Sequence, residues 1–189
     1  PDAIPEKHLR IAEIVKKKYG LKVLKFKKRK DIQPYARKVF ETLNASFAPL
    51  YGFAELTPKQ IDYYVRIYIP MLRLNLITLI VREEDDTVVG FGISLPSLSH
   101  ALQKAKGRLF PFGFIPLLKA MHSKTKIVDL YLMGILPEYQ NKGVNALLFC
   151  DLIPEYIKLG AEYAESNIEL ETNTAVQAQW DYFKREHHK

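Results

Sequence analysis

The chain has 189 residues, of which 48% are apolar and 26% are charged, and its formal net charge is +7. This length fits one domain with a well-buried core, and the composition is ordinary for a globular protein. Cys150 is the single cysteine, so an internal disulfide and a disulfide-stapled secreted scaffold are both excluded.

No apolar run approaches the ~20 residues that are needed to span a bilayer, and the N-terminus has no signal-peptide pattern. We therefore expect a cytoplasmic protein without a membrane span. His100 and His122 have no carboxylate or cysteine partners at metal-ligand spacing, so we expect no metal site.

The N-terminal segment predicts a helix over residues 4–19, with Lys16 to Lys18 in its last turn and Gly20 as its stop. Apolar and basic residues alternate over 21–27, which predicts the first strand. We expect residues 1–20 to be an N-terminal helix or linker and 21–189 to be the main domain.

Residues 16–30 contain eight lysines and one arginine. Such a run indicates either a patch for nucleic acid or a solvated face, where lysines also prevent pairing at a sheet edge. We favour the solvated face, because aromatic residues that could stack on bases are limited to Tyr19 and Phe26. Nucleic acid is therefore not the partner that we expect.

Two helices are predicted next. Asp31 is a candidate cap for a helix that runs to about Ser46, and Thr57-Pro58 is a typical start for a second helix that ends near Pro70. Strands follow over 76–82 and 88–95, joined by an acidic turn as a hairpin. Gly90 and Gly92 indicate a bulge or close packing.

Residues 97–125 are expected to form an insertion. Two short helices are predicted over 99–106 and 115–122, and the segment Phe110 to Phe114 between them is rich in aromatic residues. Long insertions in compact domains are usually functional or mobile. This one is either an apolar wall of a binding site or a small satellite core, and we favour the first.

The stretch from Lys126 to Tyr156 carries the main functional signal. A β-rich run ends at Pro137, a polar turn follows, and Gly143 opens a segment with helical spacing of apolar residues. A helix start presents unpaired N–H groups and the positive end of the helix dipole to an anion. Gly143 permits close approach and Lys142 adds a positive charge, so this layout predicts phosphate binding.

The helix after this loop should bend at Pro154 and end at Gly160. A strand is expected over 163–171, and Asn173 offers a cap for a last helix over 175–186.

The run Gln140-Asn141-Lys142-Gly143-Val144-Asn145 resembles the Gln/Arg-x-x-Gly-x-Gly/Ala loop of the GNAT acyltransferase superfamily. It departs from that pattern at Asn145, where the family prefers glycine or alanine. The order of predicted elements from Leu21 to about Glu186 is similar to the GNAT order, and the long insertion is similar to an uncharacterised bacterial subgroup. The resemblance implies an α/β fold with a mixed central sheet flanked by helices and with splayed strands around a coenzyme A site. Further strands that GNAT domains normally carry are expected outside the chain.

The resemblance also implies that acetyl-CoA, or another acyl-CoA, is the co-substrate. The loop residues Gln140 to Asn145 would hold its pyrophosphate, a backbone N–H near Ile135 would face the thioester carbonyl, and Asn173 would contribute to the cofactor site. Gly134 would produce the bulge that separates the two strands.

The implied reaction is direct attack of an amine on the thioester. A base fourteen residues before the loop glycine corresponds to Asp129, whose alternative role is that of a surface carboxylate; Glu169 and Glu171 are rival candidates. The family's tyrosine acid corresponds in position to Trp180, which we expect to be a packing residue. Tyr182 is the nearest candidate acid, but two residues on a helix are a rotation of about 200°, so it faces elsewhere and the acid stays unassigned.

The resemblance leaves the acceptor open. We expect a small-molecule or peptide amine with an apolar part, bound near Phe47, Tyr51 and Phe53 and the insertion, although these aromatics are equally compatible with the core. A non-catalytic acyl-CoA-binding module remains the alternative function, and the oligomeric state is not predicted.

Overall fold

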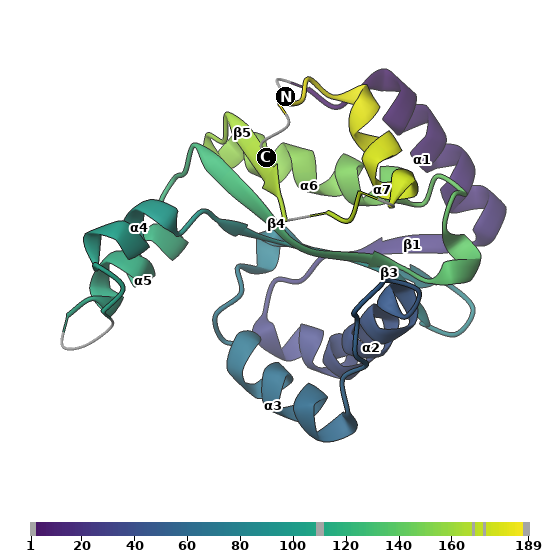
Figure 1. Cartoon of the computed structure of the whole chain (residues 1–189). Coiled ribbons are helices and arrows are strands. Elements are labelled where there is room, and N and C mark those ends of the chain that lie inside the picture. Colours follow the sequence, from purple (N-terminus) through teal and green to yellow (C-terminus); the bar gives the residue numbers. More distant parts are fainter. Residues whose placement is uncertain (1–2, 109–111, 168, 172, 187–189) are drawn as a thin grey trace.

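The computed structural model describes residues 3–108, 112–167, 169–171 and 173–186, without the side chains of residues 174, 175 and 182. Within these residues, five strands form one mixed sheet whose spatial order follows the sequence (Figure 1). Neighbouring strands are antiparallel except for the last pair, which is parallel. The strands are β1 (Leu21–Leu24), β2 (Ile77–Arg82), β3 (Val88–Pro96), β4 (Ile127–Ile135) and β5 (Tyr163–Ser166).

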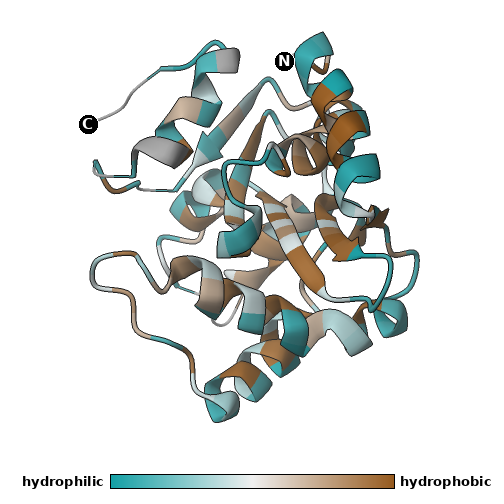
Figure 2. Ribbon diagram, turned by 90° about the vertical axis from the view of Figure 1, so that its right-hand side faces the viewer, coloured by the Kyte–Doolittle hydropathy of each residue, from teal (hydrophilic) through white to brown (hydrophobic). Residues whose placement is uncertain are grey.

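Helices cover both faces of the sheet, which confirms the expected mixed α/β architecture (Figure 1). One face is covered by α2 (Arg29–Phe47) and α3 (Pro58–Tyr68), and the other by α1 (Glu6–Tyr19) and α6 (Asn145–Leu159), with α7 (Thr174–Gln179) beside them. Because both faces are covered, β2 and β3 read as nearly continuous apolar runs. Figure 2 shows the hydrophobic residues gathered on the sheet and on the helices that pack against it.

Local sequence rules explain most helix ends. Thr57 and Gln60 form a capping box at the start of α3, and Gly20 and Gly160 end α1 and α6 in the left-handed conformation. The expected cap at Asp31 is wrong, because α2 begins two residues earlier and Asp31 lies in its first turn. A carboxylate is still favourable there, next to the positive end of the helix dipole.

The insertion forms the predicted helix pair, α4 (Ser99–Lys104) and α5 (Phe114–His122), which projects from one end of the sheet (Figure 1). Arg73 anchors α5 by donating to the carbonyls of Met121 at 3.3 Å and Ser123 at 3.2 Å. Phe112 is 71% exposed and Phe114 is 42% exposed. Phe110 and Pro111 lie outside the described residues, so the predicted aromatic wall is described only in part.

Short 3-10 turns complete the fold. They are Leu74–Leu76 before β2, Pro137–Tyr139 after β4, and Trp180–Tyr182 after α7. No helix in the described part of the chain is both long and apolar enough to span a membrane.

Candidate functional site

The last two strands separate after a short stretch of pairing. The parallel contact between β4 and β5 runs only to the pair Leu130 and Ser166, whereas β4 continues to Ile135. Just past the pairing, the Asn167 side chain donates to the carbonyl of Tyr131 at 2.6 Å. The strand predicted over 163–171 is therefore too long. Among the described residues, no strand pairs with this edge of β4 over its last residues, so we call it the free edge of β4.

The bulge in β4 lies at Tyr131 rather than at Gly134. The pairing with β3 advances by three residues in β4, from Asp129 to Leu132, while β3 advances by two, from Ile93 to Leu95. Gly134 pairs regularly and has a different role, because a Cβ there would lie 2.6 Å from the Phe91 ring. The expectation that Gly134 causes the bulge is wrong.

The bulge changes which side chains face α2 and α3. Leu130 packs under α6, whereas the next two residues, Tyr131 and Leu132, both pack on the opposite face. Side chains of a regular strand alternate between the faces, so the extra residue brings Tyr131 to the α2–α3 side.

The free edge of β4 presents backbone groups that β3 does not use. Leu136 donates its N–H to Val89 in β3 at 2.9 Å. Because N–H groups alternate along an antiparallel strand, those of Met133 and Ile135 point away from β3. The Ile135 carbonyl accepts a hydrogen bond from the Gln140 side chain at 2.9 Å, which fixes the entry to the loop.

The loop itself has the backbone geometry of an anion cradle. Asn141 and Gly143 adopt positive φ angles of 57° and 78°, and the first backbone bonds of α6 run from Ala146 to Gly143 and from Leu147 to Val144. Among the described residues, none of the backbone N–H groups of residues 141–145 donates a well-formed hydrogen bond. A run of free N–H groups at a helix start can bind a phosphate.

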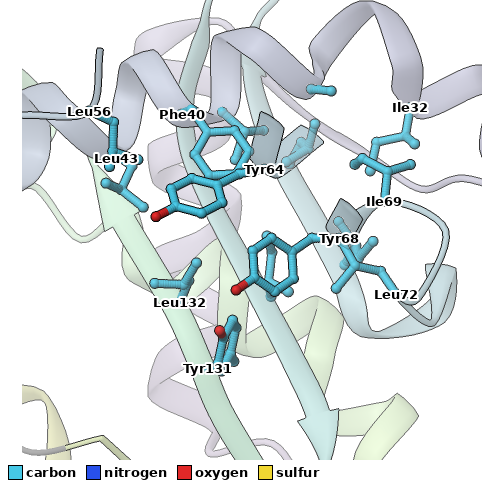
Figure 3. Close-up of a pocket in the computed structure, with 15 residues that line it drawn as sticks. Ile32, Phe40, Leu43, Leu56, Tyr64, Tyr68, Ile69, Leu72, Tyr131 and Leu132 are labelled. Atoms are coloured by element: carbon cyan, nitrogen blue, oxygen red, sulfur yellow. The ribbon is translucent and has the colours of Figure 1, made fainter. Parts of the chain in front are cut away.

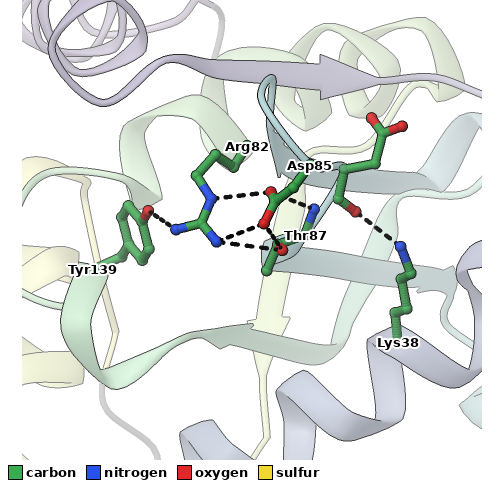
Figure 4. Close-up of polar contacts among 6 residues, drawn as sticks. Lys38, Arg82, Asp85, Thr87 and Tyr139 are labelled. Atoms are coloured by element: carbon green, nitrogen blue, oxygen red, sulfur yellow. Dashed lines mark hydrogen bonds and ion pairs between the residues drawn. The ribbon is translucent and has the colours of Figure 1, made fainter.

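Aromatic and charged side chains hold the loop in place. Tyr139 is buried at the start of the loop, and Arg82 donates to its hydroxyl at 3.4 Å (Figure 4). Arg82 also forms a two-pronged pair with Asp85, at 3.0 and 2.7 Å, and holds the pKa of that carboxyl well below its usual range. The Lys142 ammonium lies over the rings of Tyr19, at 5.5 Å, and Tyr139, at 5.9 Å.

Helix α1 packs directly behind the loop. A Cβ on Gly143 would lie 2.7 Å from Ile11 and 3.4 Å from Val15. Glycine is thus required both by its φ angle and by the contact with α1. His8 is buried in the same helix, with its ring near those of Phe149 and Phe183, a contact that apolar spacing did not reveal.

An apolar cavity of about 210 Å³ lies between α2, α3 and the sheet, and it reaches the bulge of β4. Tyr64, Tyr68 and Tyr131 line its edge, and Figure 3 shows the hydroxyls of Tyr68 and Tyr131 directed toward one another. Burial raises the pKa of Tyr131, and nearby Tyr68 adds to this effect through charge and a hydrogen bond. No local pattern groups these tyrosines in the sequence, because the bulge and the packing of α3 bring them together.

Asp129 lies two residues before the bulged tyrosine. Its neighbours Val128 and Leu130 pack under α6, so Asp129 faces the other side, which is also the side of Tyr131. Burial raises the pKa of Asp129, and the negative charge of Glu165 on β5 raises it further. A hydrogen bond from Ser97 acts in the opposite direction and lowers this pKa. A carboxylate with a raised pKa is suited to accept a proton near neutral pH.

The structure gives other roles to several predicted residues. Glu169 lies outside β5 and accepts a hydrogen bond from the Trp180 ring at 2.8 Å, and Trp180 packs against Phe149 and Phe183, as expected. Asn173 caps α7 by accepting from Val176 at 3.3 Å. The side chain of Tyr182 lies outside the described residues.

The aromatic residues between α2 and α3 also differ in part from the expectation that they line the acceptor site. Phe47 and Phe53 contact one another at 5.7 Å between ring centres and join the core, whereas Tyr51 is 92% exposed. In the part of the chain that the structure describes, no group of three or more His, Cys, Asp or Glu side chains could hold a metal ion.

No family model matches the sequence. A curated relative, protein YghO of Escherichia coli, is 30% identical over 101 residues, which is 51% of this chain, and the chain spans only 26% of that relative's length.

Solved structures match over nearly the whole chain. An aminoglycoside acetyltransferase from an uncultured soil metagenomic sample, in complex with sisomicin, has a TM-score of 0.57 and 13% identity, and covers 92% of this chain and 93% of its own. The aminoglycoside N-acetyltransferase AAC(6')-Iy, in complex with a CoA-based bisubstrate analogue, has a TM-score of 0.53 and 10% identity, with coverages of 89% and 93%. The chain therefore has the fold of the GNAT acetyltransferases.

Proposed function

We propose that the chain is an acyl-CoA-dependent N-acyltransferase that acts on an amine. The observation that carries this proposal is the run of free backbone N–H groups over residues 141–145, directly after a strand whose last residues have a free edge. The loop supplies donors for a pyrophosphate, and the edge supplies donors and acceptors for the extended pantetheine arm. The fold shared with acetyltransferases is consistent with this assignment.

The binding residues follow from this arrangement. Gln140 and Asn141 shape the loop, Lys142 adds charge, and Gly143 lets the backbone approach. Val144, which is buried, and Asn145 begin α6. Asn173 is retained as a further contact of the cofactor, although its side chain already caps α7.

The free N–H of Met133 or Ile135 is placed to stabilise the oxyanion that develops on the thioester carbonyl. The amine nitrogen forms the new C–N bond, the C–S bond breaks, and coenzyme A leaves as its thiol after protonation. Asp129 accepts the proton that the amine loses, directly or through a water. Loss of one oxyanion donor typically lowers the rate by ~10²–10³. Tyr131 lies on the same face as Asp129 and borders the bulge, so it is a further candidate acid beside Tyr182.

The surroundings of the bulge disfavour a polycationic acceptor. Among the described residues, the tyrosines at the cavity edge (Tyr64, Tyr68 and Tyr131) offer no carboxylate that could pair with a polycation, and the chain carries a net charge of +7, which repels polyamines at long range. An amine with an apolar part fits better, as the sequence also suggested.

Isothermal titration with acetyl-CoA tests binding, and release of the coenzyme A thiol in the presence of an amine panel tests turnover. We expect binding and amine-dependent thiol release. No binding at millimolar acetyl-CoA contradicts the proposal. Tight binding without turnover for any amine favours the alternative, a non-catalytic acyl-CoA-binding module.

A further inference from the structure

The cavity between α2, α3 and the sheet is larger than packing requires. Protein cores contain few voids larger than a water molecule, and an engineered apolar cavity of roughly 150 Å³ already binds benzene. The cavity here measures about 210 Å³ and lies between the sheet and the helices α2 and α3. Its size indicates a binding site.

The lining is suited to a hydrocarbon. Its walls are formed by aliphatic residues of α2, β2 and β3, such as Ala36, Leu79 and Ile93. Among the described residues, no charged side chain lines it. An ammonium group would lose its hydration there without gaining a partner. The occupant is therefore an uncharged apolar group.

The position of the cavity identifies which apolar group can reach it. Tyr131 and Leu132 form its edge on β4, and these residues directly precede the free N–H of Met133. In the proposed function, this is the part of β4 that faces the thioester carbonyl. The first carbons beyond that carbonyl therefore lie at the cavity edge.

The edge near β4 is also the open and polar end. Tyr68 is 38% exposed, and its hydroxyl lies beside that of Tyr131 (Figure 3). Elsewhere the lining is closed to solvent, since Ile32, Ala36 and Ile77 are at most 2% exposed. An occupant attached at the polar end can thus extend inward along apolar walls.

We propose that this cavity holds the acyl chain of the donor, so that the protein prefers a medium-chain acyl-CoA to acetyl-CoA. This inference rests on the proposed function. A water molecule takes roughly 30 Å³ of liquid volume, and a methylene group is of similar size, so the cavity of about 210 Å³ has room for about seven groups beyond the carbonyl. This corresponds to a donor of about eight carbons.

Calorimetry with a series of saturated acyl-CoAs from acetyl to palmitoyl tests the proposal without knowledge of the acceptor. We expect affinity to rise by up to roughly fourfold per methylene, which is the ratio that corresponds to about 0.8 kcal/mol, and to level off or fall beyond about eight carbons, where the cavity is full. Equal affinity across the series, with acetyl-CoA bound, overturns this inference and leaves the proposed function standing. Absence of binding for every member overturns both.

Two opposite substitutions test the location. Ala36→Leu fills part of the cavity and should shorten the preferred chain by about three carbons, and Leu43→Ala enlarges the cavity and should lengthen it by a similar amount. Leu159→Ala is a matched control, because it removes the same atoms from the core beneath α6, on the other face. It should leave the chain-length preference unchanged.

Retained acetyl-CoA affinity shows that each variant is folded. If the cavity-lining variants keep the wild-type preference while folded, the acyl chain binds elsewhere and the proposal is wrong. If they change only the KM for an amine, the cavity belongs to the acceptor, and the proposal is likewise overturned.

Discussion

Replacement of Asn145 by aspartate isolates the anion-binding role of the loop. Asn145 is the first residue of α6 and follows the free N–H groups of the loop. Asn145→Asp keeps the side-chain size and adds one negative charge. At a helix start this charge is favourable by ~0.3–1 kcal/mol, so the variant should be at least as stable as the wild type.

The same charge should repel a bound pyrophosphate. Two unit charges about 4 Å apart interact by about 1 kcal/mol in water and about 4 kcal/mol at an effective dielectric constant of 20. Asn145 is partly exposed, so an intermediate value of about 1.5–3 kcal/mol is expected, which is roughly a 10-fold to 100-fold loss of affinity for coenzyme A.

Gln60→Glu is a control with the same change of charge in the first turn of α3, on the opposite face of the sheet. Calorimetry with coenzyme A should show weaker binding for Asn145→Asp alone, whereas thermal melts should show an unchanged or higher Tm for both variants, because both place the new charge at a helix start. The effect should shrink at high salt, because exposed charges are screened. Unchanged affinity in a folded Asn145→Asp protein would refute the anion cradle.

Further predictions concern the base, the loop glycine and a buried hydrogen bond. Asp129→Asn should lower kcat by ~10²–10⁴ with little effect on acetyl-CoA affinity, and it should remove the acid limb of the pH–rate profile. Burial raises the Asp129 pKa, so the folded state binds the proton more tightly than the unfolded state and the ionised carboxylate lowers stability at neutral pH. Asp129→Asn should therefore raise Tm at pH 7 but not in acid. A Tm gain that persists in acid would contradict this. Gly143→Ala should lower the free energy of unfolding by about 2–3 kcal/mol in denaturant melts, because alanine disfavours the positive φ and its Cβ would meet Ile11. An equal cost in an Ile11→Ala background would exclude the Ile11 contact as a cause. Tyr156→Phe removes the 2.5 Å hydrogen bond with buried Ser94 and should cost about 1–3 kcal/mol of unfolding free energy; a neutral effect would show that Ser94 has another partner.

Features that depend on neighbouring residues in the sequence could be predicted. The Thr57 cap, the stop at Gly20 and the strand–loop–helix around Gly143 follow from local backbone rules, and the structure contains all three. The positive φ of Gly143 needs only glycine's missing Cβ. The helix pair of the insertion follows in the same way from short apolar and polar segments.

Features that arise from tertiary contacts could not be predicted. The bulge at Tyr131 depends on the register with β3, and the meeting of Tyr131 with Tyr68 depends on how α3 packs. Gly134 looked like a bulge residue in the sequence, but its missing Cβ is needed for contact with Phe91. The early end of β5 at Ser166 is followed by Asn167, a residue type that is depleted in strands, but the bond from its side chain to Tyr131 is a tertiary contact.

The most direct test of the central claim is a titration of the 15N-labelled protein with coenzyme A, followed through the backbone amide resonances. The account predicts that the amides of Asn141 to Asn145 shift most, together with those of Met133 and Ile135 on the free edge of β4. Saturating coenzyme A that leaves these resonances in place, or that shifts a different surface instead, would contradict the account.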